Sequence, residues 1–339
     1  MRRAFQDPLS QLEPLLHGCR VLVVIVNYRT AELSIACLRS LIAERARDAG
    51  LRAVIVDNDS SDGSHARIAA AIDALGCASW AACIEAPRNG GYAYGNNLPI
   101  REALTRVDAP EFFLLLNPDC QVRPGAVQAL VSFMEENPRV GIAGSCLENP
   151  DGSDWSTAFR FPSVFGELEG GARLGLLTRL LKRWEVPMRM GAEPTRVDWL
   201  PGASMMVRRD VFESIGLMDE GFFLYYEETD FCLRAKRAGW PCWYIPQSRV
   251  MHIAGQSTGV TNREGPVKRR PQYVFDSRHR YFVKNHGVPY ALLADLAFTC
   301  GLASFRLRRA LQQKPDSDPP FLLMDSLRNS TLLRLLRAA

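Results

Sequence analysis

The sequence lacks both of the common nucleotide-binding fingerprints. No Gly-x-Gly-x-x-Gly follows the first apolar segment, and no Gly-x-x-x-x-Gly-Lys-Ser/Thr occurs anywhere in the 339 residues. Both motifs use glycine so that backbone amides can approach phosphate groups closely. Their absence excludes a dinucleotide-binding or P-loop site of the usual kind. A carboxylate that holds a divalent cation is then the available device for binding phosphates.

Paired cysteines, a strong net charge and a leading apolar segment are missing too. The nine cysteines show neither Cys-x-x-Cys pairs nor finger spacing, and Cys37, Cys120, Cys146 and Cys232 lie among apolar residues, as small core residues do. A net charge of +4 does not indicate a nucleic-acid partner. The first residues show no apolar segment of a secretory signal. We therefore expect reduced thiols and a cytoplasmic location.

Apolar runs alternate with amphipathic segments through the first third of the chain. Strands are expected at 21–26, 53–56, 80–85 and 112–116, with helices after the first three. Later segments are less regular: a strand is expected near 140–144, a hairpin turn at 150–152, and a helix that closes at Gly239. Strands that alternate with helices of 10–15 residues predict an α/β fold with a mostly parallel sheet.

The run at 112–116 ends in Asn117-Pro118-Asp119. A short apolar run is typical of a strand buried on both faces, and proline cannot continue its hydrogen-bond ladder. Asp119 then lies just past the carboxyl end of the strand, where α/β sheets bind ligands. A carboxylate there can hold a hard cation that bridges to substrate phosphates. An ordinary Asn-Pro-Asp turn is the alternative.

Polar loops follow three of the expected strands, at 27–30, 57–64 and 117–119. The carboxyl ends of parallel strands meet at one edge of a sheet, so these loops should lie together. Together they can seat a nucleotide base, a ribose and a metal-bound diphosphate. This pattern predicts a nucleotide site without either common fingerprint.

Six segments together carry a family resemblance. They lie at 24–28, 56–64, 89–97, 116–119, 202–206 and 223–230, in order and at plausible spacing. The chain resembles family 2 glycosyltransferases over roughly residues 20–255, and most of all their bacterial rhamnosyltransferase-like branch. The resemblance implies a GT-A fold, which is a Rossmann-like, mostly parallel sheet flanked by helices. It also implies inverting transfer from a nucleotide-activated sugar.

The resemblance also assigns residues to the donor and to a metal. Asp57 would contact the nucleotide base, and Asp119 would be the metal-binding carboxylate of an Asp-x-Asp motif, with His252 as a second ligand. Asn117 replaces the first Asp, which leaves one fewer carboxylate for the cation, Mg²⁺ or Mn²⁺. The expected donor-binding set is Asn27, Tyr28, Arg29, Asp57, Asn58, Asp59, Asn89, Gly91, Asn96, Asn117 and Pro118.

The acidic segment Glu227-Glu228-Thr229-Asp230 supplies the expected catalytic residues. Inverting displacement needs a base for the acceptor hydroxyl, aligned reactants and a neutralised leaving diphosphate. Glu228 falls where the family has its general base, and Glu227 and Asp230 join it in the expected site. The alternative is an ordinary acidic first helical turn. Trp199, Gly202 and Ala203 are expected to shape the acceptor side, and Trp155 either flanks the cleft or packs in the core.

The chain is expected to divide at residues 19 and 255. A polar lead-in covers 1–19, a GT-A domain with an insertion at about 161–197 covers 20–255, and a helical extension covers 256–339. The insertion shows no strand signal and suggests one basic amphipathic helix from its residues Arg173, Leu174, Leu177, Arg179, Leu180, Leu181, Lys182 and Arg183. Packing on the core and contact with a membrane are equally good explanations of it.

The extension contains a long apolar stretch at 288–305, in which Asp295 is the only charged residue. A carboxylate near the middle is costly for a membrane span, so an interfacial or core-docked helix is preferred. The tail repeats the basic amphipathic pattern, with leucines 332, 333, 335 and 336 among arginines 328, 334 and 337.

These observations predict an inverting, metal-dependent glycosyltransferase on the inner face of the cell membrane. The first expectation for the donor is dTDP-L-rhamnose, and the acceptor is a polyprenyl-linked or glycan chain of the cell surface. The membrane surface is an expected partner, self-association is left open, and nucleic acid is not expected. The alternatives are another nucleoside-diphosphate sugar, or an inactive sugar-nucleotide-binding subunit of a polysaccharide assembly complex.

Overall fold

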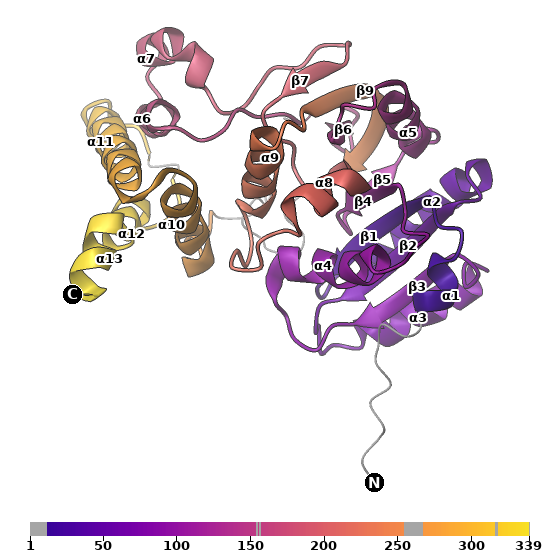
Figure 1. Cartoon of the computed structure of the whole chain (residues 1–339). Coiled ribbons are helices and arrows are strands. Elements are labelled where there is room, and N and C mark those ends of the chain that lie inside the picture. The colour runs from indigo at the N-terminus through magenta and orange to yellow at the C-terminus, as the bar shows by residue number, and fades with distance from the viewer. Residues whose placement is uncertain (1–11, 154, 156, 254–266, 316–317, 339) are drawn as a thin grey trace.

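The computed structural model describes residues 12–153, 155, 157–253, 267–315 and 318–338. Within these residues nine strands form one sheet in the order β3-β2-β1-β4-β8-β6-β9-β5, and β7 pairs with β9 (Figure 1). The predicted α/β fold with a mostly parallel sheet and a helical C-terminal region is confirmed.

The first four strands are parallel, as the alternation of apolar runs and helices predicts. They are β1 (Val21–Asn27), β2 (Leu51–Asp57), β3 (Ala81–Glu85) and β4 (Phe112–Leu116). Every residue of β1 and β4 is buried. This two-sided burial explains why these strands are continuous apolar runs and show no alternation.

The remaining strands join through mostly antiparallel pairs. They are β5 (Cys120–Val122), β6 (Ile142–Glu148), β7 (Thr195–Val197), β8 (Ser204–Arg208) and β9 (Cys242–His252). The strand β8 runs antiparallel to both β4 and β6, whereas β6 and β9 are parallel. The 161–197 insertion therefore does contain a strand, β7, which corrects the expectation from the sequence.

The helices cover the two faces of the sheet. One face packs against α2 (Ala31–Arg47), α3 (Ser64–Ala74) and α5 (Ala126–Glu136). The other packs against α1 (Leu12–Leu16), α4 (Gly91–Leu104), α8 (Arg209–Ile215) and α9 (Glu227–Arg237). Leu12, Leu15 and Leu16 are buried, so this part of the expected polar lead-in belongs to the core.

A second group of helices lies beside the sheet, on the left of Figure 1. It combines the insertion helices α6 (Val164–Ala172), α7 (Gly175–Leu180) and the 3₁₀ turn η1 (Lys182–Trp184) with α10 (Gln272–His286), α11 (Val288–Leu311), α12 (Leu322–Arg328) and α13 (Thr331–Ala338). One amphipathic helix was expected around 173–183, but the structure has the short helix α7 and the turn η1 there. Arg173 has a left-handed backbone (φ 46°), which ends α6 there.

Helices α6 and α11 approach each other closely at two glycines. A Cβ on Gly301 would lie 2.8 Å from the Ala172 nitrogen, and one on Gly171 would lie 2.7 Å from the Phe298 oxygen. Helix α11 is long and apolar enough to cross a membrane by length and composition alone, with 28% of its apolar window buried. Its Asp295 forms an ion pair with Arg278 of α10. This pairing fits a helix docked on the protein.

Gly91 at the start of α4 gives a test of the fold. Its φ is +87°, and an added Cβ would lie 1.9 Å from the Phe223 carbonyl oxygen. A left-handed non-glycine residue costs about 1–3 kcal/mol before any clash is counted. We expect Gly91→Ala to lower the free energy of unfolding by about 2 kcal/mol or more in urea denaturation.

Gly170 in α6 is the matched control, because an added Cβ there meets nothing within 4 Å. Gly170→Ala should be neutral or should stabilise by about 0.5–1 kcal/mol, since alanine is the better helix former. Equal unfolding free energies for Gly91→Ala and the wild type would contradict the close approach to Phe223.

Candidate functional site

The loops after β1 and β2 are joined by buried hydrogen bonds. Asn27 Nδ2 donates to Asp57 Oδ1 (2.7 Å), and Ser60 Oγ donates to the same oxygen (2.5 Å). Asn27 Oδ1 in turn accepts from Ser34 Oγ of α2 (2.9 Å). The structure thus brings these two loops together, as the sequence pattern predicts. Asp57 is only 2% exposed, and its hydrogen bonds hold the two loops together. Its contact with a nucleotide base stays a prediction.

The expected donor-binding loop after β3 adjoins them. Asn58 Nδ2 donates to Asn89 Oδ1 (3.0 Å) and to the Gly91 carbonyl (3.1 Å). The buried Oδ1 atoms of Asn58 and Asn96 have no hydrogen-bond partner among the described residues. Unsatisfied buried polar atoms are costly, so they point to a ligand or water as the missing donor.

The exposed rim of these loops has unusual backbone conformations. Arg29 (φ 56°), Asp59 (φ 55°) and Ser61 (φ 53°) are all left-handed without being glycine. Such conformations cost free energy and gather at functional sites. Arg29 also lies over the ring of Tyr28, 5.1 Å from its centroid. This rim is therefore a candidate binding surface.

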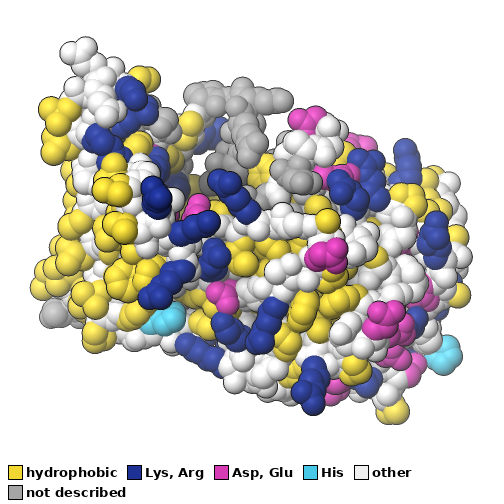
Figure 2. Space-filling view, turned by 90° about the horizontal axis from the view of Figure 1, so that it is seen from above, with side chains coloured by type: hydrophobic (Ala, Val, Ile, Leu, Met, Phe, Trp, Pro, Cys, Tyr) yellow, Lys and Arg dark blue, Asp and Glu magenta, His cyan; other side chains and the backbone are white. Residues whose placement is uncertain are grey.

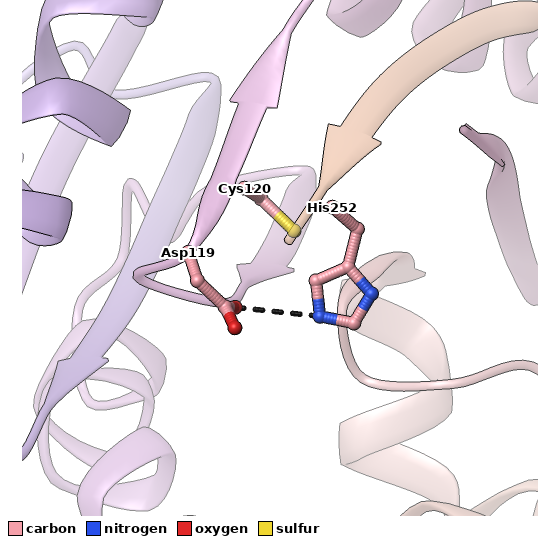
Figure 3. Close-up of side chains that lie close together, drawn as sticks. All are labelled: Asp119, Cys120 and His252. Atoms are coloured by element: carbon pink, nitrogen blue, oxygen red, sulfur yellow. Dashed lines mark ion pairs between the residues drawn. The ribbon is translucent and has the colours of Figure 1, made fainter. Parts of the chain in front are cut away.

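Asp119 and His252 form the second part of the site. Asp119 lies in the turn between β4 and β5, and His252 ends β9, opposite Cys120 in the β5–β9 pair. His252 Nε2 lies 3.3 Å from Asp119 Oδ1, and the Cys120 sulfur is close by (Figure 3). The rings of Trp155 and His252 pack edge to face, with centroids 6.1 Å apart.

These residues fit a hard divalent cation. A carboxylate oxygen and an imidazole nitrogen are suitable ligands for such ions. His252 Nδ1 is buried and has no hydrogen-bond partner among the described residues. Cys120 is not needed as a ligand, because its thiol donates to the Ala203 carbonyl (3.2 Å) and burial raises its pKa well above the ordinary value. This agrees with the expectation that Cys120 is a core residue.

Glu227 and Glu228 form the third part, at the first turn of α9. Glu227 is 2% exposed, and the Oε2 atoms of both carboxyls are buried without a hydrogen-bond partner among the described residues. The preceding Tyr225 (φ 69°) and Tyr226 (φ 68°) are both left-handed, an uncommon pair. The backbone is strained where it presents these two carboxyls.

The two carboxyls differ in their affinity for protons. Burial raises the pKa of Glu228 to about 7, although hydrogen bonds from backbone amides, including that of Gly202, and from Glu227 act in the opposite direction. Burial and the neighbouring Glu228 raise the pKa of Glu227 well above its ordinary value. Both carboxyls therefore hold a proton more tightly than an exposed glutamate does.

Gly202 and Ala203 connect the acidic pair to the Asp119–His252 pair. The Gly202 amide bonds to Glu228, and the Ala203 carbonyl accepts from the Asn117 amide (3.0 Å). The hydroxyl of Tyr92 donates to the Gly202 carbonyl (2.6 Å), and burial, together with the nearby Glu228 and Glu227, raises its pKa. Tyr92 was not among the residues expected from the sequence, where only its place in a matched segment marked it.

Two of the expected residues have clear packing roles. The Trp199 ring stacks on Phe159 with centroids 4.4 Å apart, and its Nε1 donates to the Arg160 carbonyl (2.9 Å). Contact of Trp199 with an acceptor stays a prediction. Pro118 is buried beside Asp119, and it ends β4 as the sequence predicts.

The structure does not bring Asp230 into this site. Asp230 is fully buried, and its carboxylate accepts from Arg234 (2.9 Å), Lys284 (2.8 Å) and Asn285 (2.9 Å). Two positions along a helix are about 200° apart, so Asp230 faces away from Glu228. Its contacts join α9 to α10, and a catalytic role for Asp230 stays a prediction.

Comparison with solved structures identifies the class of fold. A mannosyltransferase from Pyrobaculum calidifontis, solved in complex with GDP-Man and Mn²⁺, superimposes with a TM-score of 0.54 at 14% identity, over 94% of this chain and 83% of that one. The fold is therefore that of the GT-A glycosyltransferases.

The sequence comparison goes further. The family described as "Glycosyltransferase like family 2" matches residues 17–266, and the chain belongs to this family. Curated rhamnosyltransferases among its relatives confirm the predicted rhamnosyltransferase-like branch of the family.

Two relatives illustrate the range of the family. The chain is 34% identical over 154 residues to the N-acetylglucosaminyl-diphospho-decaprenol L-rhamnosyltransferase of Mycobacterium tuberculosis. That match covers 44% of this chain and 49% of the relative, so the chain spans about half of that enzyme's length. It is also 32% identical over 264 residues to the low-salt glycan biosynthesis hexosyltransferase Agl10 of Haloferax volcanii, covering 78% of this chain and 75% of that relative.

Proposed function

We propose that the protein transfers L-rhamnose from dTDP-L-rhamnose to a polyprenyl-linked or glycan acceptor, in the synthesis of a cell-surface glycan. The transfer depends on a divalent cation, Mg²⁺ or Mn²⁺, and takes place at the inner face of the cell membrane. The observation that carries the proposal is one arrangement. The Gly202–Ala203 segment contacts both acidic parts of the site: the Gly202 amide bonds to Glu228, and the Ala203 carbonyl accepts from Cys120, next to the Asp119 that pairs with His252.

The names of the relatives support the proposed donor and acceptor. The Mycobacterium tuberculosis relative is named for an L-rhamnosyl group and for an acceptor that carries a diphospho-decaprenol. A sugar nucleotide suits the polar loops around Asn27, Asn58 and Asn89, which offer amide donors and acceptors to a base and a ribose. A donor with a different sugar or nucleotide is the alternative.

Each residue then has a stated task. Glu228 takes the proton from the acceptor hydroxyl, and Glu227, which keeps its own proton, hydrogen-bonds to it. Asp119 and His252 would hold the cation, which when bound neutralises the charge of the leaving diphosphate. The sheet edge and the Gly202–Ala203 segment hold donor and acceptor in line for a single displacement, which inverts the anomeric centre.

The first prediction concerns the general base. Glu228→Gln keeps the size of the side chain but cannot accept the proton, so turnover should fall by about 10²–10⁴-fold. Wild-type turnover should rise with pH through about 7, because only the deprotonated form of Glu228 acts as a base. This rise should be absent in Glu228→Gln. Release of nucleoside diphosphate over a pH series measures both.

Two neighbouring variants are the controls for this prediction. Glu227→Gln should cost less turnover, because the glutamine can still donate a hydrogen bond to Glu228. Asp230→Asn should act mainly on stability, since Asp230 lies in the α9–α10 junction. If either variant lowers turnover more than Glu228→Gln, Glu228 is not the base. Slow hydrolysis of the donor by the wild type without acceptor would separate an enzyme from an inactive binding subunit.

The second prediction concerns the cation. Asp119→Ala should nearly abolish transfer and should weaken donor binding in titrations that contain Mn²⁺. With EDTA the difference from the wild type should disappear, because both then lack the cation. Cys120→Ser is the control: a hydroxyl can replace the thiol as donor to Ala203, so cation-dependent binding should persist. Full wild-type activity in EDTA would exclude the cation role.

The membrane proposal depends on exposed apolar side chains of the second group of helices, which lies beside the sheet. They fall at helical spacing on successive helices, as Leu176 and Leu180, Leu293 and Leu296, Leu307 and Leu311, Met324 and Leu327, and Leu332, Leu335 and Leu336. On the left of Figure 2 apolar side chains lie between arginines and lysines. Apolar stripes with a basic surround are typical of helices that bind anionic membrane surfaces.

The third prediction follows from this surface. The protein should float with anionic vesicles and should be released by high salt, because salt screens attraction between basic residues and lipid. A double change on α13, Leu335→Glu with Leu336→Glu, should weaken flotation. Val107→Glu, at a fully exposed apolar residue outside these helices, should leave it unchanged. Flotation that resists both salt and alkaline wash would instead indicate that α11 spans the bilayer.

A further inference from the structure

The loop that presents Glu228 is held at both ends by one helix of the C-terminal extension. At its start, Asp219 accepts hydrogen bonds from Arg280 (2.9 Å) and Lys284 (2.7 Å) of α10. At its end, Asp230 accepts from the same Lys284 (2.8 Å) and from Asn285 (2.9 Å). Lys284 therefore bridges two carboxylates that flank residues 220–229.

The middle of the loop rests on the same helix. Ser277 Oγ donates to the Leu224 carbonyl (2.9 Å), and Ser277 is itself buried. The ring of Tyr273 contacts that of Phe223 (centroids 5.4 Å apart) and lies 6.3 Å from that of Tyr225. One face of α10 thus follows the loop along its length.

The loop needs this support because its backbone is unfavourable. Tyr225 and Tyr226 are consecutive left-handed residues directly before Glu227. Tyrosine does not favour that conformation, so the surrounding structure must impose it. Tyr226 contacts Tyr281 of α10 (centroids 5.3 Å apart), which adds a further contact at the strained position.

We propose that α10 is a positioning element of the catalytic site and that Lys284, by bridging Asp219 and Asp230, is the positioning residue that aligns Glu228 with the acceptor hydroxyl. The proposal rests on the proposed role of Glu228 as base. It gives the helical extension a task in the reaction besides the membrane contact proposed above.

Lys284 is a good probe because its removal leaves no carboxylate without a partner. Asp219 keeps Arg280, and Asp230 keeps Arg234 and Asn285. The bridge between the loop ends is lost while each end keeps a separate ion pair. Misplacement of a reacting group by about 1 Å can cost roughly 100-fold in rate.

The experiment compares Lys284→Met, Lys284→Arg and Lys236→Gln. Lys236 is the matched control, because it forms one lysine–aspartate pair of the same length, 2.7 Å to Asp198, near the other end of α9. Steady-state kinetics are measured at varied donor concentration, and thermal melting is followed in parallel. We expect Lys284→Met to lower kcat by about 10–100-fold with the KM for the donor within about two-fold. Lys284→Arg should restore most of the turnover, and Lys236→Gln should match the wild type.

Wild-type kcat in a folded Lys284→Met protein would overturn the proposal, and so would an equal loss of kcat in Lys236→Gln. If Lys284→Met does not fold, Ser277→Ala decides, because it removes only the hydrogen bond to Leu224. It should lower kcat at unchanged donor KM, and an unchanged kcat would overturn the proposal. Glu228→Gln in the same assay separates the two questions. Full activity of that variant would refute the base assignment whatever the lysine variants do.

Discussion

Burial of two adjacent carboxyls at the start of α9 is the constraint on which the rest of the site depends. A buried carboxylate is costly unless it is paired or stays protonated, and here burial raises the pKa of both glutamates. The residues around the pair must also leave room for a strained backbone. Glycine provides this room at two positions, because a side chain on Gly91 would collide with Phe223 and one on Gly202 would collide with Tyr92. The small residues of the matched segments thus follow from the burial of the acidic pair.

The topology of the sheet explains how distant parts of the chain reach one site. The parallel half delivers Asn27, Asp57 and Asp119 to one edge, because the carboxyl ends of neighbouring parallel strands coincide. The reversal at β8 and the return of β9 then bring Gly202 and His252 to the same edge from far along the chain. The parallel strands therefore supply the residues of the proposed donor side, and β8 and β9 bring Gly202 and His252 to the proposed site of the cation and the base.

The sequence predicts those features that depend on local pattern. The strand at 112–116, the proline that ends it and the position of Asp119 all follow from a short apolar run and its terminator. The strand β9 was missed because it carries Pro246 and its pairing with β6 shifts register there, so it lacks a regular strand pattern. The direction in which the Asp230 side chain points could not be predicted from the sequence either. Glu228 and Asp230 are both acids in one helical turn, and the partners Lys284 and Asn285 of Asp230 lie more than fifty residues further on, beyond the reach of a local pattern.

Helix α10 shows why the helical extension is hard to separate from the catalytic domain. One of its faces holds the loop before Glu227, and Arg278 on another face pairs with Glu167 of α6 and Asp295 of α11. Asp295 also accepts from the Thr331 amide at the start of α13. Helices α11 and α13, which carry exposed apolar side chains, are thereby connected to the helix that contacts the loop before Glu227. The contacts of α10 with Glu167 and with Asp230 cross the boundary expected at residue 255, so the extension packs on the residues before it.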